Sequence, residues 1–143
     1  VELGVVTIQP IAARRSVVKL AGERADKRVA HWQGVVASAC EQCGRNQVPV
    51  VAPPLTLAHW LGQRQDGRLL FLSPLAEARL ADLPQPGAMD CLVAGPEGGF
   101  DADEIAALHA AGAIPVRLGP RVLRTETAAL AALAAMQTLW GDF

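Results

Sequence analysis

The chain alternates between blocks that predict strands and blocks that predict helices. Residues 4–11 are apolar and β-branched and predict a strand, and residues 24–43 carry apolar side chains at helical spacing until a glycine ends the pattern. Residues 48–54 predict a short strand that stops at two prolines. Residues 56–63 predict a short helix with Thr56 as its N-cap.

Continuous apolar runs in the second half predict buried strands over residues 67–74, 89–97 and 113–120. Between the last two, residues 100–113 predict a helix. Asp101 is its expected N-cap, Glu104 completes a capping box, and Gly112 ends it.

The C-terminal segment predicts a helix made almost wholly of alanine, leucine and methionine. Thr125 is the expected N-cap, and Glu126 lies favourably in the positive first turn. The residues expected to face the core are Leu130, Leu133, Met136 and Trp140. Arg121 and Arg124 come just before this helix, where positive charge is unfavourable unless an anion or a carboxylate is near. The helix alone therefore does not explain them.

The order of these elements predicts the fold class. Strands alternate with helices and the strands are continuously apolar, which is typical of an α/β protein with a mostly parallel sheet flanked by helices on both faces. With 143 residues, of which 51% are hydrophobic, the chain is long enough to build one core without disulfides or metal. We expect a single domain over residues 1–143. Because Val1 is not a start methionine, we also expect the chain to be part of something longer.

The charge of the whole chain is balanced. Thirteen basic and fourteen acidic residues give a net charge of −1, so the total charge gives no argument for nucleic-acid binding. Basic side chains nonetheless gather in one window, at Arg14, Arg15, Lys19, Arg24, Lys27 and Arg28. This window is either a basic face or the solvated surface of a loop and a helix, and the charge pattern favours the second interpretation.

Location and cysteine chemistry follow from absences in the sequence. No apolar run reaches the ~18 residues of a membrane span, and no charged-then-apolar leader opens the chain, so we expect a soluble, cytoplasmic protein with no membrane partner. Cys40, Cys43 and Cys91 are too few for a disulfide framework. The C-x-x-C pair has no second pair or histidine cluster and lies late in a helix, where a thiolate is not stabilised, so we expect reduced thiols and no metal.

Two loops that follow predicted strands are the candidates for ligand binding. "GPEGG" follows the strand at 89–94, and "GPRVLRTET" follows the strand at 114–118. In parallel sheets, ligands bind outside the carboxyl ends of the strands, and glycines let the backbone approach a ligand closely. Neither loop is a G-x-G-x-x-G or Walker sequence, which disfavours dinucleotides and nucleoside triphosphates. The expected ligand is small, with an adenine-like face and a modest charge, and is held mainly by backbone on two neighbouring strands.

Three longer segments carry a resemblance to a known family. "HWQGVVASACEQCGRNQVP", "LVAGPEGGFDADEI" and "VRLGPRVLRTETAALAAL" together resemble the 16S ribosomal RNA uracil-N3 methyltransferase family, of the SPOUT class. The likeness runs from "ELGV" to the last helix, and the pair "GPEGGF" and "LGPRVLRTETA", in this order and spacing, is specific.

The resemblance implies a fold, a cofactor and partners. The fold would be a SPOUT domain with a C-terminal trefoil knot, through which the alanine-rich helix is tucked. The methyl donor would be S-adenosylmethionine, and the acceptor a uridine of small-subunit ribosomal RNA, free or in the assembled subunit. The resemblance also implies a homodimer, with each cofactor site beside the partner. Members of the family it resembles carry an RNA-binding barrel of the PUA type before this domain, and we expect that barrel to lie outside residues 1–143.

The resemblance also implies site residues. The cofactor pocket would use Leu72, Ser73, Gly95, Glu97, Gly98, Gly99, Leu118, Gly119, Leu123, Arg124, Thr127 and Ala128. Since the N3 of uracil carries a proton at neutral pH, methyl transfer needs that proton lost or the resulting anion stabilised. Arg124 or Arg45 are candidates to stabilise an oxyanion or bind a phosphate, and Glu126 either accepts the proton or serves the helix dipole.

An alternative function from another class stays open. A knotted, dimeric module that binds RNA or assists ribosome assembly would carry the same segments without catalysing transfer. It predicts RNA affinity without methylation, whereas the methyltransferase hypothesis predicts binding of the methyl donor.

Overall fold

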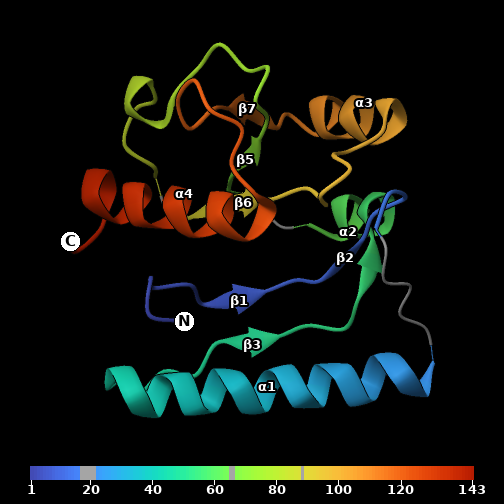
Figure 1. The fold of residues 1–143 in the computed structure, drawn as a ribbon, viewed down its shortest axis with the longest axis vertical. Coiled ribbons are helices and arrows are strands. Elements are labelled where there is room, and N and C mark those ends of the chain that lie inside the picture. The colour runs from blue at the N-terminus through green and yellow to red at the C-terminus, as the bar shows by residue number, and fades with distance from the viewer. Residues whose placement is uncertain (17–21, 65–66, 88) are drawn as a thin grey trace.

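The structure is a computed structural model and describes all residues except 17–21, 65–66 and 88 (Figure 1). The first half contains β1 (Thr7–Ile8), β2 (Ile11–Ala12), α1 (Glu23–Cys43), β3 (Val50–Val51), β4 (Leu55–Thr56) and α2 (Leu57–Gln63). The second half contains β5 (Arg68–Leu72), the short 3-10 helix η1 (Leu80–Asp82), β6 (Asp90–Val93), α3 (Ala102–Ala110), β7 (Ile114–Val116) and α4 (Thr125–Trp140).

All pairs between these strands are parallel, which confirms the predicted α/β class. The strands form separate ladders, β1 with β3, β2 with β4, and a three-stranded sheet in the order β6-β5-β7. The single strand predicted over residues 4–11 is therefore wrong in extent. It is interrupted at Gln9 and Pro10, because proline has no N–H to donate to a ladder, and β4 was not predicted.

The central strand β5 divides the core into two clusters. Leu69 and Phe71 point to one face of the sheet and pack with side chains of α2 and α3. Leu70 points to the other face and packs with Val116 of β7 and Ala132 of α4. Figure 1 shows α3 and α4 on opposite sides of this sheet, as the alternation of side chains along a strand requires. The prediction of helices on both faces is thus confirmed for the three-stranded sheet.

The N-terminal half forms a layer around α1. This helix lies alongside β3 (Figure 1), and Gln33 joins the two segments: its Nε2 donates to the carbonyl of Pro49 at 2.9 Å and its Oε1 accepts from the amide of Val51 at 2.9 Å. Arg24, Lys27 and Arg28 are exposed on α1, which both interpretations of the basic window predict. Lys19 of that window lies outside the described residues.

Most predicted helix ends are confirmed. The Thr56 hydroxyl accepts from the amide of His59, and Gly44 follows α1 in the left-handed region. Asp101 and Glu104 form the predicted capping box of α3. The prediction of Thr125 as N-cap of α4 is wrong. Arg124 holds that position with an extended backbone, and Thr125 is the first helical residue.

The face of α4 that packs on the sheet differs from the predicted one. Leu130 is 59% exposed, whereas Ala132 is fully buried and Ala135 packs beside it. Met136 and Trp140 of the predicted stripe do pack against this cluster. The core side of α4 is therefore formed by Ala132 and Ala135 together with Met136 and Trp140.

Candidate functional site

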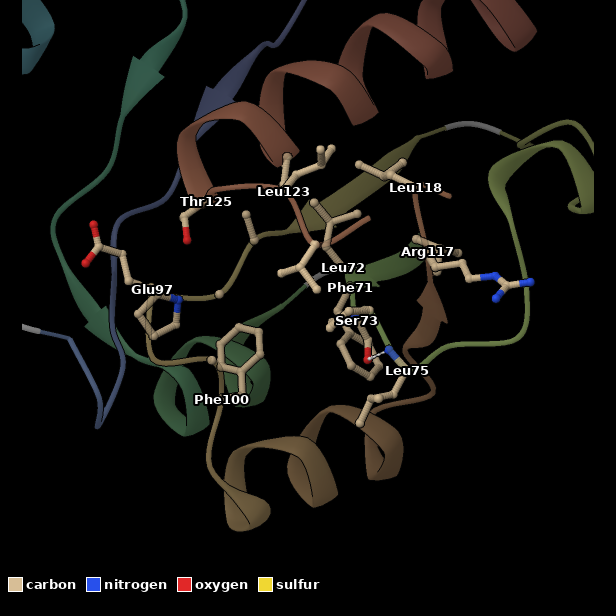
Figure 2. A pocket seen from close by; sticks show the side chains of 18 of the residues that line it. Phe71, Leu72, Ser73, Leu75, Glu97, Phe100, Arg117, Leu118, Leu123 and Thr125 are labelled. Carbon is tan, nitrogen blue, oxygen red and sulfur yellow. Dashed lines mark hydrogen bonds between the residues drawn. The ribbon is translucent and has the colours of Figure 1, made fainter. Parts of the chain in front are cut away.

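A cavity of about 310 Å³ lies at the carboxyl ends of the three-stranded sheet. It is lined by the segments that follow β5, β6 and β7, by Ile105 of α3, and by Thr125 and Ala128 in the first turns of α4 (Figure 2). Both loops predicted to bind a ligand reach it. The sequence suggested that the strands before these loops are neighbours. They are not, because β6 and β7 pair with opposite edges of β5. The end of β5 therefore forms the floor between the two loops.

The walls of this cavity are mainly apolar. Figure 2 shows Leu72, Leu118 and Leu123 gathered together, with Phe100 on the side of α3. Polar side chains are few at the wall, and they include the hydroxyls of Ser73 and Thr125, the carboxylate of Glu97, and Arg117 and Arg121. Apolar walls with a few polar groups are typical of pockets for small molecules.

The "GPEGG" loop forms a tight turn along one wall. The amide of Gly99 donates to the carbonyl of Pro96 at 2.8 Å, and Gly99 has a φ of 68°, which only glycine adopts without strain. A Cβ added at Gly95 would lie 3.1 Å from the Phe100 ring. These glycines therefore allow the turn and its contact with the following phenylalanine.

The start of α3 is fixed directly after this turn. The Asp101 carboxylate accepts from the amide of Glu104 at 2.8 Å, and the Glu104 carboxylate accepts from the amide of Asp101 at 3.0 Å. The amide of Glu104, and then Arg14, lower the pKa of Asp101 below its usual value. Glu104 itself is 7% exposed. The loop thus enters the helix through a rigid cap.

Most of the predicted cofactor residues converge on the cavity. Those that line it are Leu72, Ser73, Gly95, Glu97, Gly99, Leu118, Gly119, Leu123 and Ala128. Gly98, Arg124 and Thr127 belong to the same segments but do not line it. A Cβ at Gly98 would meet the side chain of Arg15 at 3.3 Å, so Gly98 faces away from the cavity.

Several residues that line the cavity were not predicted from the sequence. They are chiefly the apolar side chains Phe71, Leu75, Phe100, Ile105 and Val122, together with Arg117 and Arg121. Phe100 directly follows the glycine loop and could have been included on that basis. Leu75 and Val122 are 91% and 81% exposed, and no periodic pattern in their loops predicts where such side chains lie.

The proposed catalytic residues occupy different surroundings. Arg124 and Glu126 are exposed at the start of α4, next to Thr125, which does line the cavity. Arg45 instead donates to the carbonyls of Val1 and Val5 at 2.6 and 2.9 Å. The guanidinium of Arg45 thereby ties the N-terminal segment to the end of α1.

We expect Arg45→Ala to lower the free energy of unfolding by about 2 kcal/mol, because two charge-assisted hydrogen bonds are lost. Urea denaturation measures this loss, and Arg24→Ala, on the exposed face of α1, is the control. A variant of unchanged stability would contradict this structural role of Arg45.

The family model for the RNA methyltransferase domain matches residues 1–137 of the chain. The chain belongs to this family. It is 35% identical, over its whole length, to the ribosomal RNA small subunit methyltransferase E of Buchnera aphidicola, of which it covers 57%. The protein of the same name from Mycobacterium bovis is 42% identical over 89% of the chain, which covers 51% of that relative. The chain therefore spans little more than half the length of these relatives.

Solved structures give the same result for the fold of this methyltransferase domain. A putative methyltransferase of Legionella pneumophila, in complex with the cofactor SAM, superposes with a TM-score of 0.94 at 41% identity. The match covers 99% of this chain and 59% of the Legionella chain. The ribosomal RNA small subunit methyltransferase E of Neisseria gonorrhoeae, bound to S-adenosyl methionine, superposes with a TM-score of 0.92 at 46% identity. The match covers 99% of this chain and 58% of the Neisseria chain.

Cys40, Cys43 and Cys91 are free thiols in the structure. Cys40 is buried and Cys43 is exposed. Among the described residues, no group of histidine, cysteine and acidic side chains is arranged to hold a metal ion. Nor does any helix within the described ranges have the length and apolar character of a membrane span.

We expect the reactivity of each cysteine thiol to decrease as its burial increases. Burial raises the pKa of the Cys91 thiol, which lowers the fraction of the reactive thiolate. We expect a disulfide reagent at pH 8 to modify Cys43 first, with Cys40 and Cys91 at least about tenfold slower. Mass spectrometry of the labelled peptides identifies the modified residue. Rapid labelling of Cys40 in the folded chain would contradict the packing of α1.

Proposed function

We propose that this chain is the catalytic domain of a methyltransferase that transfers a methyl group from S-adenosylmethionine to N3 of a uridine in small-subunit ribosomal RNA. The observation that carries the proposal is the cavity at the ends of β5, β6 and β7, on which most of the predicted cofactor residues converge. A relative of TM-score 0.92, named as a small-subunit ribosomal RNA methyltransferase, is bound to S-adenosyl methionine, and this supports the choice of cofactor.

The residues of the cavity fit such a cofactor. Gly99 and Gly119 line the wall, and a Cβ added at either would meet no atom within 4 Å. At both positions a ligand can therefore approach the backbone closely. Apolar side chains such as Leu72 and Leu118 suit the flat face of an adenine, and the amides and carbonyls of the two loops suit its edge. We propose Leu72, Ser73 and the two loops as the binding residues.

The reaction asks mainly for positioning. S-adenosylmethionine supplies an activated methyl group when bound. The protein has to hold the uracil ring so that N3 is in line with that group, and to remove or accommodate the N3 proton. Arg124, exposed beside the cavity, is proposed to stabilise the negative charge that develops on the ring or to bind a phosphate. Glu126, the second residue of α4, is the candidate proton acceptor.

We propose a homodimer as the working unit. Leu130 in the second turn of α4 is 59% exposed, and Val122 at the edge of the cavity is 81% exposed. Exposed aliphatic side chains that lie together beside a pocket are typical of surfaces that meet another protein. A partner placed there would lie beside the cofactor site, as the resemblance implies.

We also propose a C-terminal knot and a cytoplasmic location, because the family likeness implies both. Residues 1–143 are proposed to form a single domain.

Methyl transfer to defined substrates tests the proposal. The chain is incubated with labelled S-adenosylmethionine and either naked 16S RNA or assembled small subunits that lack the modification, and the digested nucleosides are analysed by mass spectrometry. The expected product is 3-methyluridine. RNA binding and donor binding without any methylated nucleoside would instead favour the non-catalytic RNA-binding module.

A further inference from the structure

The outer side of the "GPEGG" turn is in contact with Arg15, a residue far away in the sequence. The Nη1 of Arg15 donates to the carbonyl of Gly98 at 3.0 Å. The Cβ of Arg15 lies 3.3 Å from the position that a Cβ of Gly98 would occupy. Glu97 and Gly99, on either side of Gly98, line the cavity. Arg15 therefore holds the turn from behind, on the side opposite the cavity.

This contact fixes the peptide group between Gly98 and Gly99. Its carbonyl accepts from Arg15, and its N–H donates to the carbonyl of Pro96 at 2.8 Å. Both polar ends of one peptide plane are thus satisfied by partners in fixed directions. The plane cannot turn without losing one of the two hydrogen bonds, and with it the orientation of the residues that face the cavity.

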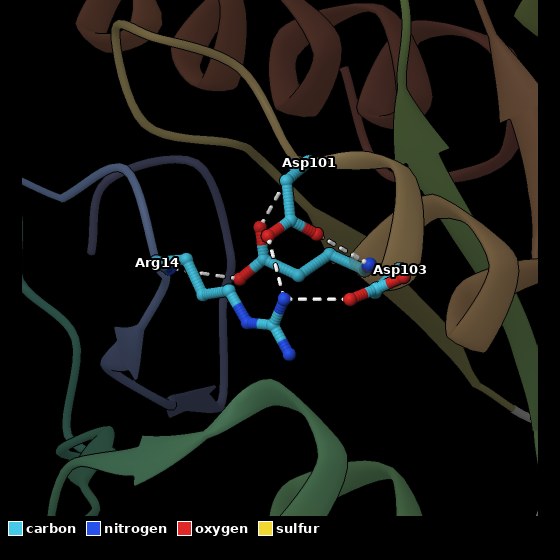
Figure 3. A network of polar contacts seen from close by, with 4 residues as sticks. Arg14, Asp101 and Asp103 are labelled. Atoms are coloured by element: carbon cyan, nitrogen blue, oxygen red, sulfur yellow. Dashed lines mark hydrogen bonds and ion pairs between the residues drawn. The ribbon is translucent and has the colours of Figure 1, made fainter.

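The segment that carries Arg15 is itself anchored on α3 (Figure 3). The amide of Arg14 donates to the buried carboxylate of Glu104 at 2.9 Å. The guanidinium of Arg14 pairs with Asp101 at 3.2 Å and with Asp103 at 2.6 Å. Because the Arg14 side chain is 66% exposed, the ion pairs add little, and the hydrogen bond to Glu104 is the main anchor. Arg15 thereby starts from a fixed backbone.

We propose that Arg15 is a positioning residue for the cofactor loop, acting through the carbonyl of Gly98 without touching the cofactor. The inference rests on the proposed function, since it assumes that S-adenosylmethionine binds in this cavity. It assigns to Arg15 a role other than that of a solvated charge in the basic window. It also explains why position 98 is a glycine although it does not face the cavity: a side chain there would displace Arg15.

Calorimetric titration of S-adenosylmethionine into variants of the chain tests this role. Arg15→Met keeps the aliphatic stem beside Gly98 and removes the donor. We expect its dissociation constant to rise by up to about tenfold, because the released peptide group also adopts orientations that do not bind, and the energy of one charge-assisted hydrogen bond limits this cost. Arg15→Lys keeps a donor and is expected to recover most of the affinity. Arg24→Met, the same change on the exposed face of α1, is the matched control and should bind as the unsubstituted chain does.

Melting temperatures separate positioning from folding. All three variants are expected to melt within about 3 °C of the unsubstituted chain, because the hydrogen bond of Arg15 is at the surface. Arg15→Met binding within twofold of the unsubstituted chain would overturn the inference while the proposed function stands. Absence of binding by the unsubstituted chain itself would overturn the proposed function, and this inference with it.

Discussion

Replacing Arg68 by alanine is expected to lower the free energy of unfolding by about 3 kcal/mol, because it leaves the carboxylate of Asp90 without a partner in a largely buried place. Arg68 at the start of β5 forms a two-pronged pair with Asp90 of β6, Nε to Oδ1 at 2.7 Å and Nη2 to Oδ2 at 2.6 Å. The two side chains are only 14% and 8% exposed. The guanidinium also lies 4.4 Å from the centre of the Trp140 ring, so this pair joins the sheet to the end of α4.

Urea denaturation of Arg68→Ala and Arg79→Ala provides the comparison. Arg79 forms a similar pair with Asp82 at 2.7 Å, but the side chains of Arg79 and Asp82 are 61% and 41% exposed. Water replaces an exposed pair at little cost, so the second variant should lose far less stability. Equal losses in the two variants would show that burial does not determine the contribution of Arg68, and would contradict this account of how α4 is held.

Ala128→Phe is expected to abolish binding of S-adenosylmethionine, raising its dissociation constant at least about a hundredfold, because a ring would enter the cavity in place of the cofactor. Ala128 lines the cavity from the first turn of α4, and Leu118 and Leu123 line it from the preceding loop. Calorimetry measures the affinity, and circular dichroism establishes that the variant keeps its helices.

The matched control for this variant is Ala110→Phe. Ala110 is the last residue of α3 and is exposed, so the same substitution adds the same side chain outside the cavity. It should bind the cofactor as the unsubstituted chain does. Unchanged affinity in Ala128→Phe would place the cofactor somewhere other than this cavity.

Local chemistry made much of the fold predictable. The capping box of Asp101 and Glu104 and the N-cap at Thr56 depend on residues within one helical turn, and the structure contains both. The strand order depends on contacts between distant segments. Nothing in the sequence indicates that β5 lies between β6 and β7, and the helical period of α4 did not predict that Leu130 is exposed while Ala132 is buried.

The site was predictable to the same degree and for the same reason. Loops that follow parallel strands meet at one edge of the sheet, so the segments around Gly95 and Gly119 could be assigned from the sequence. Which residue of a segment faces the cavity depends on turn geometry, and Gly98, predicted among the cofactor residues, does not line the cavity. Its contact with Arg15 joins residues 83 positions apart, which no local pattern predicts.

The central claim is that this chain binds S-adenosylmethionine in the cavity at the ends of β5, β6 and β7, and titrating the cofactor into the folded chain by calorimetry tests it most directly. We predict one site per chain with micromolar affinity, lost in Ala128→Phe and kept in Ala110→Phe. A chain that is folded by circular dichroism yet gives no binding heat at millimolar cofactor would contradict the claim.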